Sequence, residues 1–147
     1  MDCENTQDAA SGARLFVYGT LRNGFRSHQI LQRLHARFLG RGRVRGRLFD
    51  LVRYPGAVES ENEAEFVSGE VYLLPRAEMS FRVLDRYEGF DPSDSEFNEF
   101  VRKETIVTMD SGREIRAWIY WLLRARASGR RIRSGNYPVH RAECWRI

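Results

Sequence analysis

The sequence has few of the residues that build metal centres, disulfide frameworks or membrane spans. Its two cysteines, Cys3 and Cys144, lie near opposite ends, and no Cys-x-x-Cys or His/Cys cluster accompanies them. This pattern predicts free thiols in a reducing cytoplasm and no metal site. No apolar run approaches the ~20 residues of a membrane helix, and the polar stretch 1–13 lacks the apolar core of a secretory signal. We therefore expect a cytoplasmic protein without a membrane partner.

Length and composition favour one soluble globular unit. A chain of 147 residues with 42% hydrophobic and 30% charged residues is typical of a single domain with a sizeable core. We expect residues 1–13 to form a disordered leader and residues 14–147 to form the domain.

Lysine is almost absent, since Lys103 is the only one, and the net charge of +4 comes mainly from arginine. An arginine bias spread over the whole chain is weak evidence for nucleic-acid binding. The denser set between Arg124 and Arg133 lacks interleaved aromatic residues and any reading motif. The sequence therefore predicts a solvated, mobile loop there and makes nucleic acid an unlikely partner.

The hydrophobic pattern predicts several strands and two helices that do not alternate regularly. Strands are expected at 14–18, 38–52 (one long bent strand or a pair), 66–74, 100–109 and 114–123, helices at 27–34 and 76–88, and turns at 54–58 and 110–112. Pro75 is expected to open the second helix and Gly89 to cap it. This order indicates the α+β class, with a mixed curled sheet or small barrel and helices packed outside.

The first strand ends in a way that suits ligand binding. The apolar run that begins at Leu15 reaches Gly19, and a polar segment follows. A glycine permits a sharp turn or the close approach of a ligand. Amides beyond a strand end lack ladder partners and together form a concave anion site. Taken alone, this feature names no ligand.

Glu88 is the most informative carboxylate. It continues the apolar stripe of Phe81 and Leu84 at i, i+3 and i+7, in the last turn of the second helix. Burial and the helix dipole both raise the pKa of a carboxyl there, which suits a general base at neutral pH. Periodicity alone favours a half-exposed glutamate that pairs with Arg82 or Arg86.

Two motifs resemble those of the γ-glutamylcyclotransferase superfamily, and more narrowly its γ-glutamylamine cyclotransferase branch. These are Tyr18-Gly19-Thr20-Leu21 and, some seventy residues on, Leu84-Asp85-Arg86-Tyr87-Glu88-Gly89. Weaker matches are Tyr54-Pro55, Phe100-Val101-Arg102 with Phe in place of the family's Tyr, and the altered terminal motif Ser134-Gly135-Asn136-Tyr137. The resemblance covers roughly residues 15–137.

The resemblance implies a small mixed β-barrel flanked by helices. It also implies an enzyme of the lyase or acyltransferase class that converts a γ-glutamyl amine or peptide to 5-oxoproline and a free amine, without metal or cofactor. Glu88 becomes the acid/base, and the substrate-binding loop is Tyr18, Gly19, Thr20 and Leu21. Arg22 and Arg102 are further candidates for binding the substrate's charge. Phe100 and the altered motif at 134–137 leave the substrate open.

Three other hypotheses remain open on sequence grounds. The first is a binding module on the same scaffold without chemistry, and the second is an arginine-rich barrel that binds nucleic acid. The third is a hydrolase with Cys144 as nucleophile and His140 as base, at i and i+4. The leaving amine and the oligomeric state are not determined by the sequence.

Overall fold

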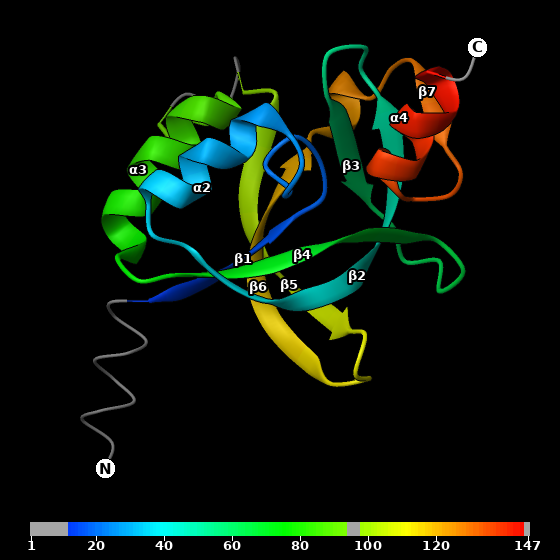
Figure 1. Cartoon of the computed structure of the whole chain (residues 1–147). Coiled ribbons are helices and arrows are strands. Elements are labelled where there is room, and N and C mark those ends of the chain that lie inside the picture. The colour runs from blue at the N-terminus through cyan, green and yellow to red at the C-terminus, as the bar shows by residue number, and fades with distance from the viewer. Residues whose placement is uncertain (1–11, 94–97, 146–147) are drawn as a thin grey trace.

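The computed structural model describes residues 12–93 and 98–145, in which a strongly bent sheet carries helices on its outside (Figure 1). The strands are β1 (Ala13–Val17), β2 (Arg37–Asp50), β3 (Pro55–Glu59), β4 (Phe66–Leu74), β5 (Phe100–Met109), β6 (Glu114–Leu122) and β7 (Arg130–Ile132). The helices are α2 (Gln29–Arg33), α3 (Ala77–Glu88) and α4 (Tyr137–Trp145), with the 3-10 turns η1 (Arg26–His28) and η2 (Arg124–Arg126).

Within the described residues, five strands close into a mixed barrel in the order β2-β4-β1-β6-β5 and back to β2. Neighbouring strands are antiparallel except β1 and β6, which run parallel at Leu15 and Trp118. The C-terminal half of β2 leaves the barrel and pairs with β3 and β7. The predicted α+β fold with a small mixed barrel is therefore confirmed.

Glycine allows the barrel to close where β5 returns to β2. Gly42 pairs with Met109, and a Cβ atom at position 42 would lie 2.8 Å from the carbonyl oxygen of Thr108. A side chain there would push the two strands apart. The glycine-rich sequence of β2 thus lets this strand curve across the barrel and serve two sets of partners.

The core has two parts because β1 is buried on both faces. Phe16 points into the barrel, where it packs with Val44, Ile119 and Trp121. Its neighbour Leu15 belongs to the second cluster, which joins the barrel to the helices and includes Leu31, Phe81 and Leu84. This second cluster fixes α3 against the end of the barrel. None of the helices found in the described ranges is long and apolar enough to cross a membrane.

Three sequence predictions need correction in the N-terminal half and at α3. The first strand begins at Ala13, one residue before the expected start, and residues 1–11 of the expected leader lie outside the described residues. The helix expected at 27–34 is a 3-10 turn followed by the short α2. Pro75 precedes the N-cap residue Arg76 instead of opening α3, while Gly89 caps this helix in the left-handed conformation as predicted.

The segment expected to be a turn at 54–58 is instead mostly the strand β3. Pro55 pairs with Asp50 at the start of β3, where a missing N–H is tolerated. The turn lies just before it and is closed by a 2.9 Å hydrogen bond from the N–H of Leu51 to the carbonyl oxygen of Tyr54. Pro55 and Gly56 are typical of turns, but in this structure they belong to the strand that follows the turn.

The arginine-rich segment is more ordered than the predicted mobile loop. Arg130 and Arg131 lie in β7 and pair with Asp50 and Phe49 of β2. Arg131 also donates a 2.6 Å hydrogen bond to Glu65. A strand of three residues is too short to show an alternating pattern. Its pairing with the distant strand β2 therefore cannot be predicted from the local sequence.

Candidate functional site

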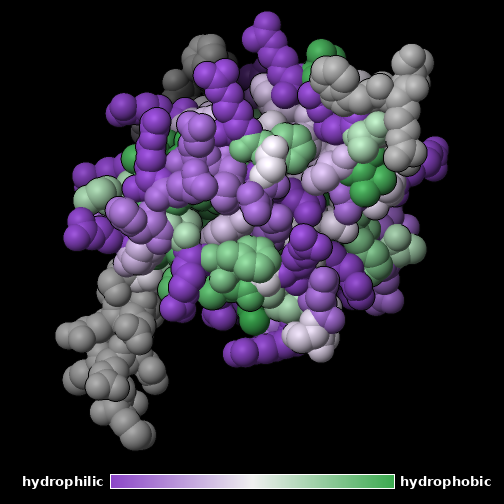
Figure 2. Space-filling view, viewed as in Figure 1, coloured by the Kyte–Doolittle hydropathy of each residue, from purple (hydrophilic) through white to green (hydrophobic). Residues whose placement is uncertain are grey.

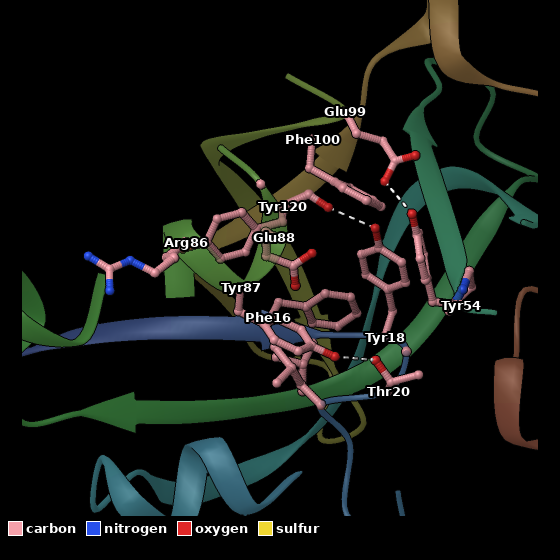
Figure 3. Close-up of a pocket in the computed structure, with 15 residues that line it drawn as sticks. Phe16, Tyr18, Thr20, Tyr54, Arg86, Tyr87, Glu88, Glu99, Phe100 and Tyr120 are labelled. Atoms are coloured by element: carbon pink, nitrogen blue, oxygen red, sulfur yellow. Dashed lines mark hydrogen bonds between the residues drawn. The ribbon is translucent and has the colours of Figure 1, made fainter. Parts of the chain in front are cut away.

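A cavity of about 390 Å³ lies where the end of β1, the end of α3 and the start of β5 meet (Figure 3). It brings together both motifs of the sequence analysis. Its lining consists of Phe16, Val17, Tyr18, Gly19, Thr20, Leu21, Tyr54, Pro55, Arg86, Tyr87, Glu88, Gly89, Glu99, Phe100 and Tyr120. The cavity is thus aromatic with two carboxylates among the side chains.

Helix α3 delivers Glu88 to this cavity. Phe81 and Leu84 anchor the helix in the core, and Glu88 continues the same stripe one turn later. The helix ends there because Gly89 adopts a left-handed conformation with φ 68°. Figure 3 shows the Glu88 carboxylate directed into the cavity, among the aromatic side chains. Arg82 pairs with Glu78, and no salt bridge between described residues joins Glu88 to Arg82 or Arg86, so the arginine pair is not formed.

The environment of Glu88 favours its neutral form. Burial of the carboxyl group and, to a smaller extent, the negative charge of Glu99 together raise the pKa of Glu88 to about 8. The rise agrees with the sequence prediction, but Glu99 is a cause that the sequence did not indicate. A carboxyl with this pKa exchanges protons readily near neutral pH.

The turn after β1 presents backbone donors at the cavity. A 3.0 Å hydrogen bond from the N–H of Arg22 to the carbonyl oxygen of Gly19 closes this turn. No hydrogen bond between described residues uses the N–H groups of Gly19, Thr20 or Leu21. Gly19 also packs tightly against Pro55, since a Cβ atom would lie 2.6 Å from its Cγ. The turn is therefore restrained while its amides stay available to a ligand.

The Tyr18 hydroxyl holds the site together. It donates to the carbonyl oxygen of Tyr120 at 2.7 Å and accepts from the N–H of Ala57 at 3.1 Å. The side chain is buried, and this burial raises the pKa of its hydroxyl far above the usual range. Both bonds of the hydroxyl are made to backbone groups, so the ring of Tyr18 is the part that a ligand meets.

A second hydrogen bond links the turn to α3. Thr20 Oγ1 and the hydroxyl of Tyr87 share a hydrogen bond of 3.0 Å (Figure 3). Tyr87 directly precedes Glu88, so this bond ties the amide-bearing turn to the helix end that carries the carboxylate. The two motifs of the sequence analysis are thus joined by a direct contact.

The two arginine candidates lie outside the cavity lining. Arg22 is buried beside Glu70, with 3.8 Å between Nε and Oε2, and donates to the carbonyl oxygen of Ser68 at 3.3 Å. Arg102 makes two hydrogen bonds of 2.9 and 3.2 Å to Asp85. Both guanidinium groups are therefore engaged by protein groups behind the site.

Sequence reasoning did not identify Glu99, the second carboxylate of the cavity. The hydroxyl of Tyr54 donates to Glu99 Oε1 at 2.5 Å, and this bond raises the pKa of Tyr54 to about 12 (Figure 3). Glu99 precedes β5 in a polar stretch without periodicity, so nothing in the local sequence distinguishes it. In the sequence, Tyr54 stands out only through the match of Tyr54-Pro55 to a family motif.

The altered motif at 134–137 lies outside the cavity lining. The Ser134–Tyr137 motif packs on β4, where the N–H of Ser68 donates to the carbonyl oxygen of Gly135 at 2.7 Å. The acidic loop at 59–65 and the arginine-rich segment at 124–133 also lie outside the lining. Phe100, in contrast, lines the cavity directly. The exchange of Tyr for Phe is therefore the departure that bears on the site.

Other chemistry finds less support in the described residues. In residues 12–93 and 98–145, no three His, Cys, Asp or Glu side chains gather as metal ligands. The absence of metal and cofactor from the reaction stays a prediction. His140 Nε2 lies 2.9 Å from Asp50 Oδ2. The side chain of Cys144 lies outside the described part, so the hydrolase hypothesis stays untested.

Comparisons with known proteins identify the family of this chain. The family described as "Gamma-glutamyl cyclotransferase, AIG2-like" matches residues 15–139. A Methanocaldococcus jannaschii protein named "Putative gamma-glutamylcyclotransferase" is 32% identical over 128 residues, which cover 86% of this chain and 97% of that protein.

Two solved structures have the same fold. YkqA from Bacillus subtilis has a TM-score of 0.71 at 25% identity, and the match covers 92% of this chain but only 43% of that one. An AIG2-like protein from mouse has a TM-score of 0.65 at 25% identity over 80% of both chains. Since the family model covers nearly the whole barrel and both motifs, this chain belongs to the γ-glutamylcyclotransferase, AIG2-like, family.

Proposed function

We propose that this protein converts a γ-glutamyl amine or peptide to 5-oxoproline and a free amine, with Glu88 as general acid/base. The observation that carries the proposal is the Glu88 carboxyl, which lines a small cavity opposite free backbone amides and has a pKa of about 8. Family membership supports the same reaction class. We also expect this reaction to take place in the cytoplasm, as the free thiols predict.

Substrate binding follows from the charges of a γ-glutamyl group. Its α-carboxylate needs hydrogen-bond donors, and the amides of Gly19, Thr20 and Leu21 are unengaged. Backbone donors at a restrained turn are preorganised, so they lose little freedom when an anion binds. The apolar part of the substrate chain then contacts the rings of Tyr18 and Tyr120, which line the same cavity.

The reaction needs no nucleophile from the enzyme, because the α-amine of the substrate attacks its own γ-carbonyl. The new bond joins the α-nitrogen to the γ-carbon, and the bond between that carbon and the leaving nitrogen breaks. A chain folded back in the cavity brings the reacting atoms together and so removes most of the entropic cost. The five-membered ring that results is 5-oxoproline.

Glu88 moves the proton between the two nitrogens. Its ionised form accepts a proton from the attacking amine, and its neutral form then donates that proton to the departing amine. One group can perform both steps only if its pKa lies near the working pH, and a pKa of about 8 meets this condition. The low polarity that raises this pKa also strengthens each hydrogen bond to the developing charge.

The test is release of 5-oxoproline from a panel of γ-glutamyl amines, γ-glutamyl amino acids and glutathione. Glu88→Gln keeps the shape of the side chain and removes the titrating group, so we expect kcat to fall about a thousandfold or more. Glu78→Gln is the matched control, since this exposed glutamate of α3 pairs with Arg82 away from the cavity. Turnover by Glu88→Gln at the wild-type rate would overturn the mechanism.

The same panel separates the enzyme from a binding module on this scaffold. A binding module predicts that γ-glutamyl compounds protect the protein against thermal unfolding without release of 5-oxoproline by the wild type. The titratable carboxyl of Glu88 favours the enzyme, because binding alone gains nothing from a group that is mostly neutral at pH 7.

A further inference from the structure

Glu99 brings a negative charge into the cavity that no described side chain neutralises. We propose that Glu99 is a specificity-determining residue that binds a positive charge on the leaving amine of the substrate. The inference rests on the proposed function and names a substrate class within it. The preferred substrates are γ-glutamyl amides of amines that carry a second, cationic group.

The position of Glu99 is well fixed. Its carbonyl oxygen accepts a 3.0 Å hydrogen bond from the N–H of Leu123, which holds the backbone against the strand β6 side of the barrel. The hydroxyl of Tyr54 holds Oε1 at 2.5 Å, and the Tyr54 ring packs on Phe100 with 6.0 Å between centroids. One carboxylate oxygen is thus bound, and no described group hydrogen-bonds the other.

Two basic residues of β5 near Glu99 pair with other carboxylates. Arg102 pairs with Asp85, and Lys103 pairs with Glu59 at 3.1 Å. Arg86 lines the cavity, but Figure 3 shows its guanidinium group directed away from Glu88 and Glu99. Among the described residues, no salt bridge reaches Glu99. A carboxylate with a free oxygen and no cation from the protein offers an acceptor for a cationic group of the ligand.

The substrate can carry a cation at its α-amine or on the leaving amine. The arrangement of the site favours the leaving amine as the partner of Glu99. In the proposed reaction, the α-amine must lie at Glu88, because it passes its proton there. The α-carboxylate lies at the Gly19 turn. Glu99 belongs to a different segment, the start of β5, and is therefore available to the part of the substrate beyond the scissile bond.

The experiment compares two substrates of nearly equal shape. One is the mono-γ-glutamyl amide of 1,4-diaminobutane, whose far end is an ammonium, and the other is γ-glutamyl-n-pentylamide, whose far end is a methyl group. Rates of 5-oxoproline release are measured at about pH 9, where the ammonium, with a pKa of about 10.4, is still charged. The quantity compared is the ratio of kcat/KM for the cationic and the neutral substrate.

We expect the wild type to prefer the cationic substrate about tenfold, the effect of one charge-assisted hydrogen bond. Glu99→Gln should abolish the preference, because kcat/KM should fall about tenfold more for the cationic than for the neutral substrate. Tyr54→Phe frees the carboxylate and should reduce the preference in part. The matched control Glu104→Gln removes an exposed carboxylate of the same strand and should retain the full preference.

The outcomes separate this inference from the function on which it rests. An unchanged ratio in Glu99→Gln would overturn the inference. If kcat/KM fell equally for both substrates, the ratio would also stay unchanged, and the α-ammonium would be the group at Glu99. If Glu99→Gln does not fold, Tyr54→Phe replaces it in the test. A reduced ratio in Tyr54→Phe then supports the inference, and an unchanged ratio overturns it. Release of 5-oxoproline from the neutral substrate by the wild type upholds the proposed function whatever the ratio. Its absence from both substrates would overturn function and inference together.

Discussion

Glu88 and Glu99 line one cavity, and the charge of Glu99 adds to the effect of burial on the pKa of Glu88. The two carboxyls come from different elements, since Glu88 ends α3 and Glu99 precedes β5. Their environments differ as well. Tyr54 donates a hydrogen bond to Glu99, whereas no described group donates one to Glu88. With a pKa of about 8, Glu88 is mostly neutral at pH 7.

This relationship predicts how activity depends on pH. In the wild type, kcat/KM should rise through about pH 8 as Glu88 becomes the ionised base. Glu99→Gln removes the neighbouring negative charge, so the pKa of Glu88 should fall and the rise should move to lower pH. The measurement is the pH profile of 5-oxoproline release with a substrate whose leaving amine is uncharged. Glu104→Gln should leave the profile in place, and an unmoved profile in Glu99→Gln would show that its charge does not reach Glu88.

The raised pKa also predicts that stability depends on pH. The carboxyl of Glu88 has a pKa of 4.5 in the unfolded chain and of about 8 in the folded protein. Between pH 4.5 and about pH 8 the folded protein keeps the proton on Glu88, whereas the unfolded chain releases it. The free energy of unfolding therefore falls as the pH rises through this range. Glu88→Gln should therefore be more stable than the wild type at about pH 9, by a few kcal/mol, and nearly equal at about pH 4. Thermal or urea unfolding at both pH values measures this, and equal stability at high pH would contradict it.

Much of the fold was predictable because β1, β4, β5 and β6 carry strong apolar patterns in the sequence. Phe100–Met109, for example, was predicted with the bounds that the structure has. The strand β3 was missed because Pro55 and Gly56 are typical of turns, and only pairing with β2 makes them a strand. The strand β7 was missed for the same reason, since its partner lies far away in the sequence.

The site was predictable only where a residue violates a local rule. Glu88 interrupts an apolar stripe, and Gly19 ends a buried strand, so both attract attention in the sequence. Glu99 violates no rule, because a glutamate in a polar stretch is ordinary until the barrel closes around it. Arg102 shows the opposite error. It belongs to a family-like motif, yet its guanidinium contacts Asp85 behind the cavity.

Gly19 permits a close packing that a larger residue would disturb. In Gly19→Ala the new Cβ would lie 2.6 Å from Cγ and 2.9 Å from Cδ of Pro55, so one of the two segments must move. We expect a loss of about 1–3 kcal/mol in stability and a clear fall in kcat/KM, because the amides of the turn shift. Pro55→Ala relieves the contact, so the double variant should recover part of both losses. No recovery would show that Gly19 matters for its backbone conformation instead of for this contact.

Arg102 contacts Asp85, and we expect this contact to position the end of α3 that carries Glu88. Asp85 lies one turn before Glu88 on α3 and accepts hydrogen bonds from Arg102 at 2.9 and 3.2 Å and from the hydroxyl of Tyr120 at 2.6 Å. This network fixes the helix end against β5 and β6, so Arg102→Lys, which loses the two-fold contact, should lower kcat more than it raises KM. Asp85→Asn should have a similar effect, and the double variant should lose less than the sum of the two, with a coupling of about 1–3 kcal/mol. Arg116→Lys, on an exposed position of β6, is the control. Additive losses, or a rise in KM alone, would instead indicate that Arg102 binds the substrate directly, as the sequence had suggested.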